Sequence, residues 1–460
     1  MDSLNNSLVK NRLLKGAGAN FLGLLTSIII QVVSVPVFLK YWGVELYGEW
    51  LIISSLAINF TMGDVGLVTI ASNEMAMLVA NDKRKEALSI FQSAWILVTI
   101  ISLVIIGLVF VIANFLPLGK WLNISHQNHG DILSIFMLLS VNTILGFQFG
   151  LIGAGLRCEG HYPLNTVFNV ILRFLAFLAL LIGVCFGANL LQAAIIFLGV
   201  NIIGLISGFI ILKKRNPWIC YGLNHFNIKH SKHLFLLSIA FMSFPIGYIL
   251  NIQGFVVLIG IVLGPVAVVI FSTLRTFSRL SYQVISAISA TIWPEISLAF
   301  GSGKIELAKR IHRSACKVSL WVSCLMVVLL YFSGRWIVYI WTRGRIAFDQ
   351  DVFNMLLLIL IVNSLWNASI VIPLAINKHK RIAFIYIISS VFSLFLAFHL
   401  MRAFGLLGAA SALLAVDIIM AIFVLKNALV LLKDNIVEFL EYIIKPVSIK
   451  EISSLVAKGK

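Results

Sequence analysis

Long apolar stretches recur along almost the whole chain, from Gly16 to Leu431. Many of them reach twenty residues, and a bilayer core of roughly 30 Å needs about 20 apolar residues per helix. A transmembrane barrel would instead show segments of about 10 residues with strict alternation, and the sequence has no such rhythm. Only 12% of the residues are charged, against about a quarter in soluble domains. The sequence therefore predicts an all-α, polytopic membrane protein.

We expect about twelve transmembrane helices. The first fifteen residues are polar and basic, and the apolar run after them is too long for a signal-peptide core, so it is expected to remain as the first helix. The expected spans are 16–39, 47–72, 90–115, 132–156, 165–186, 191–212, 234–260, 265–296, 314–333, 352–373, 382–401 and 405–431.

The basic residues between the spans predict the orientation. With a cytoplasmic N-terminus, nineteen Lys and Arg residues fall on the inner side and six on the outer side, so both termini are placed in the cytoplasm. The outer six are Lys40, Lys120, Arg335, Arg343, Arg345 and Arg402. The net charge of +17 is spread between apolar spans and not gathered on one soluble face, so we expect no nucleic-acid partner.

Two self-matches predict an internal repeat. Residues 193–203 (AAIIFLGVNII) and 409–419 (AASALLAVDII) share six identities in eleven positions, and a weaker match at an offset of 221 lays the first two spans on the seventh and eighth. Six spans per repeat give halves related by an axis along the membrane normal. We expect two parallel six-helix bundles around a central cavity, 1–212 and 213–431, followed by a basic cytoplasmic tail, 432–460. Coincidental similarity between apolar helices is the alternative.

Three arginines lie within apolar spans, where an ionisable side chain is costly and normally faces protein or water. Arg275 and Arg279 are four residues apart and therefore share one helix face, and Arg173 lies in the fifth span. Because like charges repel, the pair requires an anion or water, and a guanidinium fork suits phosphate oxygens. We therefore expect the three to bind substrate. The alternatives are that these arginines snorkel or form structural ion pairs. For Arg275 and Arg279, the partner in such a pair would be Asp64 or Asp417.

Two aspartates and one asparagine are the other polar candidates. Asp64 lies in the second span and Asp417 in the twelfth, at the repeat position that Asn201 holds in the first half. A polar group at both symmetry-related positions indicates a cavity-facing site, and a carboxylate there could couple transport to an ion. A hydrogen bond between helices is the alternative.

No feature of the sequence predicts catalysis, a metal site or a cofactor. The five cysteines are scattered without metal-binding spacing, and the longest connection between spans, 213–233, is too short for a catalytic domain. We therefore expect a protein that acts within the membrane and is not an enzyme.

The segment from Trp42 to Ala87 resembles the O-antigen and polysaccharide flippases of the multidrug/oligosaccharidyl-lipid/polysaccharide exporter superfamily. The matching features are Gly43 with Tyr47-Gly48-x-Trp50, then Asp64-x-Gly66-Leu67 and a basic inner loop. The second half is similar through Leu263-Gly264-Pro265, Trp293-Pro294-Glu295, Gly303-Lys304 and the segment from Gly405 to Gly408. The resemblance covers nearly the whole chain in length, span count and repeat.

The resemblance implies a flippase in the bacterial inner membrane. Its substrate would be an undecaprenyl-diphosphate-linked oligosaccharide moved to the periplasmic leaflet, and Arg173, Arg275 and Arg279 would fit the cationic cavities of this family. It also implies membrane lipid, a polysaccharide polymerase and a chain-length regulator as partners. The alternatives are an exporter of the same fold for drugs or peptidoglycan-precursor lipids and, less favoured, a membrane glycan-processing enzyme.

Overall fold

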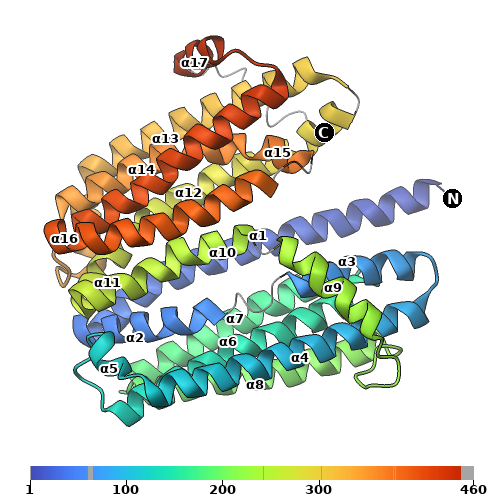
Figure 1. Ribbon diagram of the computed structural model, residues 1–460, viewed down its shortest axis with the longest axis horizontal. Helices are drawn as coiled ribbons and strands as arrows, with labels where there is room; N and C mark the ends of the chain where they lie inside the picture. Colours follow the sequence, from blue (N-terminus) through green and yellow to red (C-terminus); the bar gives the residue numbers. More distant parts are fainter. Residues whose placement is uncertain are drawn as a thin grey trace. The chain divides into compact units, whose positions relative to one another are not determined.

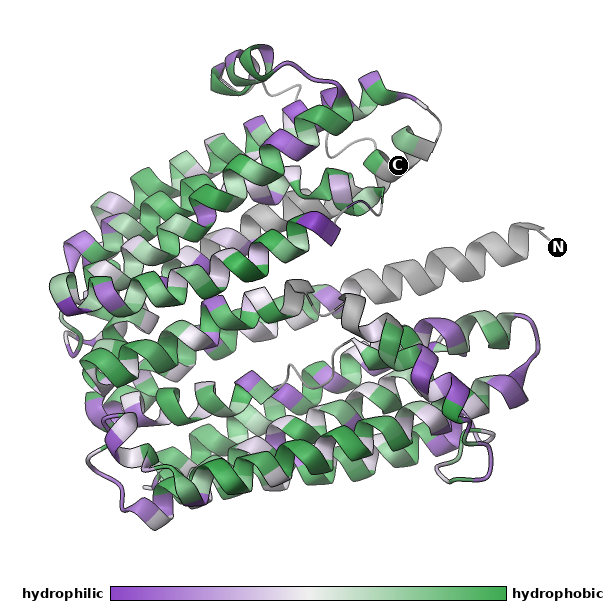
Figure 2. Ribbon diagram, in the orientation of Figure 1, coloured by the Kyte–Doolittle hydropathy of each residue, from purple (hydrophilic) through white to green (hydrophobic). Residues whose placement is uncertain are grey.

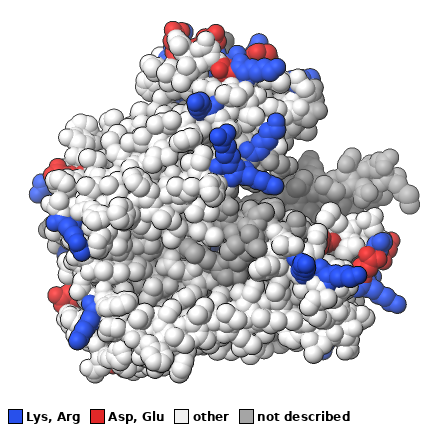
Figure 3. Space-filling view, viewed as in Figure 1, with Lys and Arg blue, Asp and Glu red and all other residues white. Residues whose placement is uncertain are grey.

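The computed structural model describes residues 2–60, 66–241, 243–301, 303–376, 378 and 380–446, and its regular secondary structure there is helical. Nine helical stretches in these ranges are long and apolar enough to cross a membrane. Figure 2 shows hydrophobic residues along the helices and hydrophilic ones at their ends and in the connections. Within each unit, the charged side chains visible in Figure 3 also gather near helix ends. This pattern fits helices whose sides contact lipid and confirms the prediction of a polytopic helical protein.

Two compact units make up the chain, Met1–Ile249 and Leu250–Lys460. We expected the two halves to divide after residue 212. The division lies later because the connection that follows residue 215 and the helix after it are fastened to the first unit, as described below. The first unit thus contains the six expected spans and the beginning of the seventh.

The first unit contains α1 to α10 (Figure 1). Their bounds are α1 Asp2–Tyr41, α2 Gly43–Ile58, α3 Leu67–Ala80, α4 Arg84–Phe115, α5 Leu118–Trp121, α6 His129–Arg157, α7 Tyr162–Cys185, α8 Leu190–Arg215, α9 Ile228–Phe241 and α10 Ser243–Ile249. The expected second span, 47–72, is divided between α2 and α3, and Gly66 precedes α3 with a φ of 71°. That left-handed conformation is one that glycine adopts without steric cost.

Close helix contacts position the first unit's spans. α1 packs on α7, α7 on α8, and α6 on α4 and α8. The α7–α8 contact depends on Gly204, where an added Cβ would overlap the side chain of Leu172. Helix α8 begins with a capping box in which Asn189 accepts from the Gln192 main chain and the Gln192 side chain accepts from Asn189. Small residues at such interfaces are typical of membrane helices.

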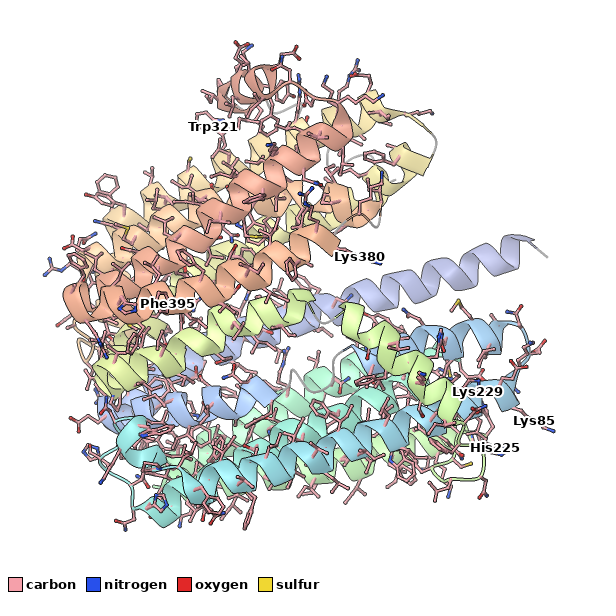
Figure 4. All side chains as sticks on the ribbon, in the orientation of Figure 1. Lys85, His225, Lys229, Trp321, Lys380 and Phe395 are labelled. Atoms are coloured by element: carbon pink, nitrogen blue, oxygen red, sulfur yellow. The ribbon has the colours of Figure 1, made fainter. Side chains whose placement is uncertain are left out.

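The connection between α8 and α9 is anchored to the N-terminal part of α4. Gln92 donates from Nε2 to the Cys220 carbonyl at 3.1 Å and accepts from the His225 main chain at 2.8 Å. Ser93 Oγ accepts from the Asn227 main chain at 3.0 Å. Figure 4 shows His225 near Lys85 and Lys229 at one end of this unit. These bonds explain why α9 belongs to the first unit.

The second unit contains the remaining elements. They are the π-helix η2 Leu250–Gly254, α11 Phe255–Leu263, α12 Pro265–Gly301, α13 Ile305–Thr342, α14 Gln350–Ser369, α15 Val371–Ala375, α16 Lys380–Leu432 and α17 Ile436–Ile444. Helices α12, α13 and α14 contact one another, and α16 packs on α14 and α11. The expected seventh span, 234–260, is therefore not one regular helix, because it includes α9, α10, η2 and most of α11.

Helix α16 contains the last two expected spans. Gly405 interrupts it with φ 57° and ψ −138°, a conformation open only to glycine. Next to this break, Gly408 lies against the main chain of Leu400 so closely that an added Cβ would overlap the Leu400 carbonyl. The glycines therefore produce the turn that the sequence places between residues 401 and 405.

Candidate functional site

A membrane-embedded polar network lies in the second unit, and it begins at the π-helix. Arg275 on α12 donates from Nη2 to the main-chain carbonyl of Asn251 at 3.0 Å. Asn251 donates from Nδ2 to Ser390 Oγ on α16 at 2.8 Å. A π-turn disrupts the regular hydrogen bonds of a helix and is frequent at functional sites. The half-buried guanidinium of Arg275 thus binds a carbonyl at the point where the seventh span is irregular.

Asp417 is the carboxylate of this network. Its Oδ1 accepts from Asn363 Nδ2 at 2.6 Å and from Trp366 Nε1 at 2.7 Å, both on α14. The residue is 7% exposed, and the positive charge of Arg275 acts on its carboxylate. A buried charge needs such partners because desolvation is otherwise unfavourable. The arrangement joins α16 to α14 through an ionisable residue in the middle of the span.

A further hydrogen bond extends the network along α14. Asn367 donates from Nδ2 to the hydroxyl of Tyr282 on α12 at 2.7 Å. Asn363, Trp366 and Asn367 are spaced at i, i+3 and i+4, so they share one face of α14. This face carries polar bonds to both α12 and α16.

Two amide oxygens of the network accept no hydrogen bond from the described residues. The Oδ1 atoms of Asn251 and Asn363 are buried and receive no hydrogen bond from the described residues. With the Asp417 carboxylate they are the type of oxygen that binds water or a hard cation. Elsewhere in the described ranges, no group of three His, Cys, Asp or Glu side chains is arranged to hold a metal ion.

Arg279 differs from Arg275 in its surroundings. It lies one turn further along α12, and its residue is exposed on the surface of the second unit. An exposed guanidinium inside a span is unfavourable in lipid and therefore indicates water or an anion. The two arginines of the predicted pair thus differ in their contacts. Arg275 donates to the main-chain carbonyl of Asn251, whereas the side chain of Arg279 is exposed.

The other predicted site residues are in the first unit. Arg173 on α7 donates from Nη2 to the Gly23 carbonyl on α1 at 2.9 Å and is otherwise exposed. Asn201 donates to the Phe197 carbonyl of its own helix at 2.8 Å. Asn201 and Asp417, which the predicted repeat pairs with each other, therefore form different bonds. Asp64 lies outside the described residues.

Sequence reasoning missed three members of the network and its irregular backbone. Trp366, Tyr282 and Ser390 are ordinary residues of a membrane helix, and only their contacts reveal their part. For Trp366 alone there was a signal, because it shares one face of α14 with Asn363 and Asn367. The π-turn at Leu250–Gly254 has no sequence signature comparable to a proline.

Comparisons with known proteins support a transporter fold. No protein-family model matches the sequence. The uncharacterized membrane protein EpsK of Bacillus subtilis is 21% identical over 293 residues, 63% of this chain, and the match spans 57% of the length of EpsK. An inward-facing multidrug resistance MATE transporter of the MOP superfamily has a TM-score of 0.70 at 14% identity and covers 88% of this chain and 99% of its own.

Two further solved structures have the same architecture. The lipid II flippase MurJ in an inward closed conformation gives a TM-score of 0.69 at 16% identity, over 96% of this chain and 91% of MurJ. A MOP superfamily transporter from Pyrococcus furiosus, described as having a binding pocket of reversed polarity, gives 0.59 at 13% identity, over 92% of this chain and 96% of that one. At these identities the likeness shows the fold alone. The chain is a multi-pass membrane protein that shares its fold with these solved transporters of the MOP superfamily.

Proposed function

We propose that this protein is a flippase for an undecaprenyl-diphosphate-linked oligosaccharide, such as an O-antigen or related polysaccharide repeat unit. It moves this lipid by alternating access from the cytoplasmic to the periplasmic leaflet of the bacterial inner membrane, with both termini in the cytoplasm. The fold that the chain shares with MurJ, a lipid II flippase by name, is consistent with a lipid-linked substrate.

The observation that carries the proposal is the pair of arginines on one face of α12. Arg279 is exposed within the span, and Arg275 is held one turn away by the Asn251 carbonyl. Two adjacent guanidinium groups bind the oxygens of a diphosphate bidentately and offset its two negative charges. Arg173 is the third cationic candidate, in the first unit. These three side chains are the proposed substrate-binding residues.

Asp417, Asn201 and Asp64 are the proposed coupling or cavity residues. Of these, Asp417 is a buried carboxylate that is bonded to Asn363, whose amide oxygen receives no hydrogen bond from the described residues, and the positive charge of Arg275 acts on it. Binding of a proton or cation there would change the charge next to Arg275. Such a change would link ion binding to the strength of diphosphate binding.

A second candidate function is export of another solute by the same fold. The similarity to a MATE multidrug transporter favours it. Cationic drugs, however, require acidic binding surfaces, whereas the ionisable residues of the second unit that lie near mid-span include two arginines and one aspartate. The cationic surface favours an anionic substrate.

The test is transport in proteoliposomes that contain a fluorescent undecaprenyl-diphosphate oligosaccharide. We expect the protein to move the lipid between leaflets without changing it covalently, as measured by exposure of the sugar to an impermeant lectin. An Arg275→Gln, Arg279→Gln variant that inserts normally serves as the inactive control. Transport of a cationic dye, with no movement of the lipid, would contradict the proposal and support the second candidate.

A further inference from the structure

The segment after the last span forms a helix that is fastened to α13. We expected residues 432–460 to be a basic cytoplasmic tail, but Ile436–Ile444 is helix α17, and its Asn435 cap accepts from the Val437 main chain. Arg313 on α13 forms a two-pronged ion pair with Asp434 and also contacts Glu438 at 2.8 Å. Lys309 lies 3.4 Å from Asp434. These charges fix the beginning of α17.

Aromatic contacts fix the rest of α17 along the same helix. Phe439 is buried and stacks on the ring of His312 with centroids 5.4 Å apart. The Lys317 ammonium lies 4.8 Å from the centre of the Tyr442 ring. Trp321 donates from Nε1 towards the carbonyls of Ile443 and Lys445, at 3.2 and 3.1 Å, and Figure 4 shows it below α17.

These contacts give the direction of α17. Its first residues lie at Arg313 and its last at Trp321, so α17 runs beside α13 in the same direction. Because α13 enters the membrane after its N-terminal turns, the C-terminal end of α17 lies closer to the bilayer than its beginning.

One side of α17 is apolar and is left exposed by the described residues. Ile436, Val437, Leu440 and Ile444 are 58, 59, 45 and 66% exposed. Their spacing places them on one face, next to the face that carries the buried Phe439 and Ile443. Glu438 and Glu441 lie on the opposite side. The apolar side of α17 is therefore only partly covered by α13, and the other side of the helix is charged.

The α13 face under α17 continues as a lipid-facing surface. Leu325, Val328 and Phe332 follow Trp321 by four, seven and eleven residues and therefore lie on the same side of α13 as Trp321. Their side chains are 57, 52 and 79% exposed. These side chains lie in a stretch that is long and apolar enough to cross the membrane. α17 therefore lies at the periphery of the second unit, at the level where its lipid-facing surface begins. Trp321 and Tyr442 mark that level, because amphipathic aromatic side chains favour the membrane interface.

We propose that α17 is a membrane-interface helix whose exposed apolar face contacts lipid. Its partner is the bilayer itself, at the boundary between headgroups and acyl chains of the leaflet that surrounds the N-terminal part of α13. This is the cytoplasmic leaflet in the orientation proposed above. Amphipathic helices bind in this way through buried apolar area, with their polar side towards water. The inference requires only that α13 spans the membrane, and it does not depend on the transported substrate.

The test uses spin labels on single cysteines in the full chain, with the five native cysteines replaced and insertion checked first. The protein is reconstituted in vesicles of phosphatidylethanolamine and phosphatidylglycerol. We expect labels at Leu440 and Ile444 to collide more with oxygen, which partitions into lipid, than with a water-soluble nickel chelate. A label at Phe332 is the lipid reference, and labels at Glu441 and Lys85 are the aqueous ones, with the reverse preference.

Other results would overturn the proposal. Dominant nickel collisions at Leu440 and Ile444 would place α17 in water, and low collisions with both agents would place it against protein. If the cysteine-free chain does not insert, p-benzoyl-phenylalanine at Leu440 in the native chain replaces the labels. A lipid photoadduct at Leu440, absent at Glu441, would support the proposal, whereas a cross-linked dimer or no adduct at either position would contradict it.

Discussion

The indole nitrogen of Trp366 donates a hydrogen bond of 2.7 Å to Oδ1 of Asp417, the same oxygen that accepts from Asn363. This oxygen joins α14 to α16 in the interior of the second unit. One atom therefore satisfies two buried donors, and its loss would leave both without a partner. The relationship leads to a direct test of whether Asp417 is a structural acceptor, a coupling residue or both.

Replacement of Asp417 by asparagine should be tolerated, because the amide retains an oxygen at Oδ1. Asp417→Leu should lower the free energy of unfolding by about 1–3 kcal/mol for each donor left unsatisfied. Thermal unfolding in detergent measures the stability of both variants. Equal stability of the Asn and Leu variants would contradict the importance of the two bonds.

The Asn variant also tests coupling. If Asp417 binds the coupling proton, Asp417→Asn should insert normally but lose the response of transport to an imposed pH gradient, measured in vesicles with the membrane potential clamped. An unchanged response would assign Asp417 a structural role only.

Lipid transport should depend on the positive charges of Arg275 and Arg279 on α12. A charge-assisted hydrogen bond contributes about 1.5–3 kcal/mol, so removal of one guanidinium from a diphosphate site should reduce lipid transport roughly tenfold or more. Lysine at Arg275 or Arg279 should retain part of the activity, whereas glutamine should not. Arg402→Gln, at the expected outer turn, is the matched control and should transport normally. Full activity of the Arg275→Ala, Arg279→Ala double variant would contradict the substrate site.

The break in α16 should be sensitive to one methyl group. Gly408→Ala places a Cβ against the Leu400 main chain, which cannot move aside as a side chain can, so we expect a loss of about 1–3 kcal/mol in stability. Gly199→Ala in α8 has open space around the new Cβ and should cause no loss. Equal melting temperatures for the two variants would show that the turn can relax.

The attachment of α17 should weaken in acid. Burial alone would raise the pKa of Asp434, but the hydrogen bond and charge of Arg313, with the charge of Lys309, outweigh it and hold the pKa below its ordinary value of 3.8. A depressed carboxyl pKa gives stability that is present above the ordinary value and is lost as the pH falls through the lowered one. At neutral pH, the wild-type protein should therefore have a higher melting temperature than the Asp434→Asn variant. This difference in melting temperature should become smaller in acid. A constant difference would contradict the role of the ion pair.

Two native cysteines test the orientation without substitution. Cys185 at the end of α7 and Cys220 in the connection after α8 are both exposed and fall on opposite expected sides. An impermeant thiol reagent added to intact cells should label Cys185 and spare Cys220. Introduced cysteines at Asn123 and Asn224 should repeat the pattern, outer and inner respectively. Reaction at Cys220 and Asn224 alone would reverse the topology.

The sequence by itself determined the helical membrane fold, because apolar runs of bilayer length leave helices as the only way to satisfy the backbone. It also located the ionisable residues of the spans, since Arg173, Arg275, Arg279 and Asp417 are conspicuous among apolar neighbours. The turn near Gly405 followed from the expected spans 382–401 and 405–431, which end and begin there. These are local properties, and they can be read without knowing what each residue contacts.

Only the tertiary structure decided which partners these residues have. It placed Arg275 at the Asn251 carbonyl, because a π-turn depends on how η2 packs on α16. It also gave Asp417 two donors on α14. It also assigned α9 to the first unit through Gln92 and Ser93, and α17 to the side of α13 through Arg313 and Trp321. Such bonds join residues far apart in the sequence, and hydrophobic periodicity contains no information about which helix faces meet.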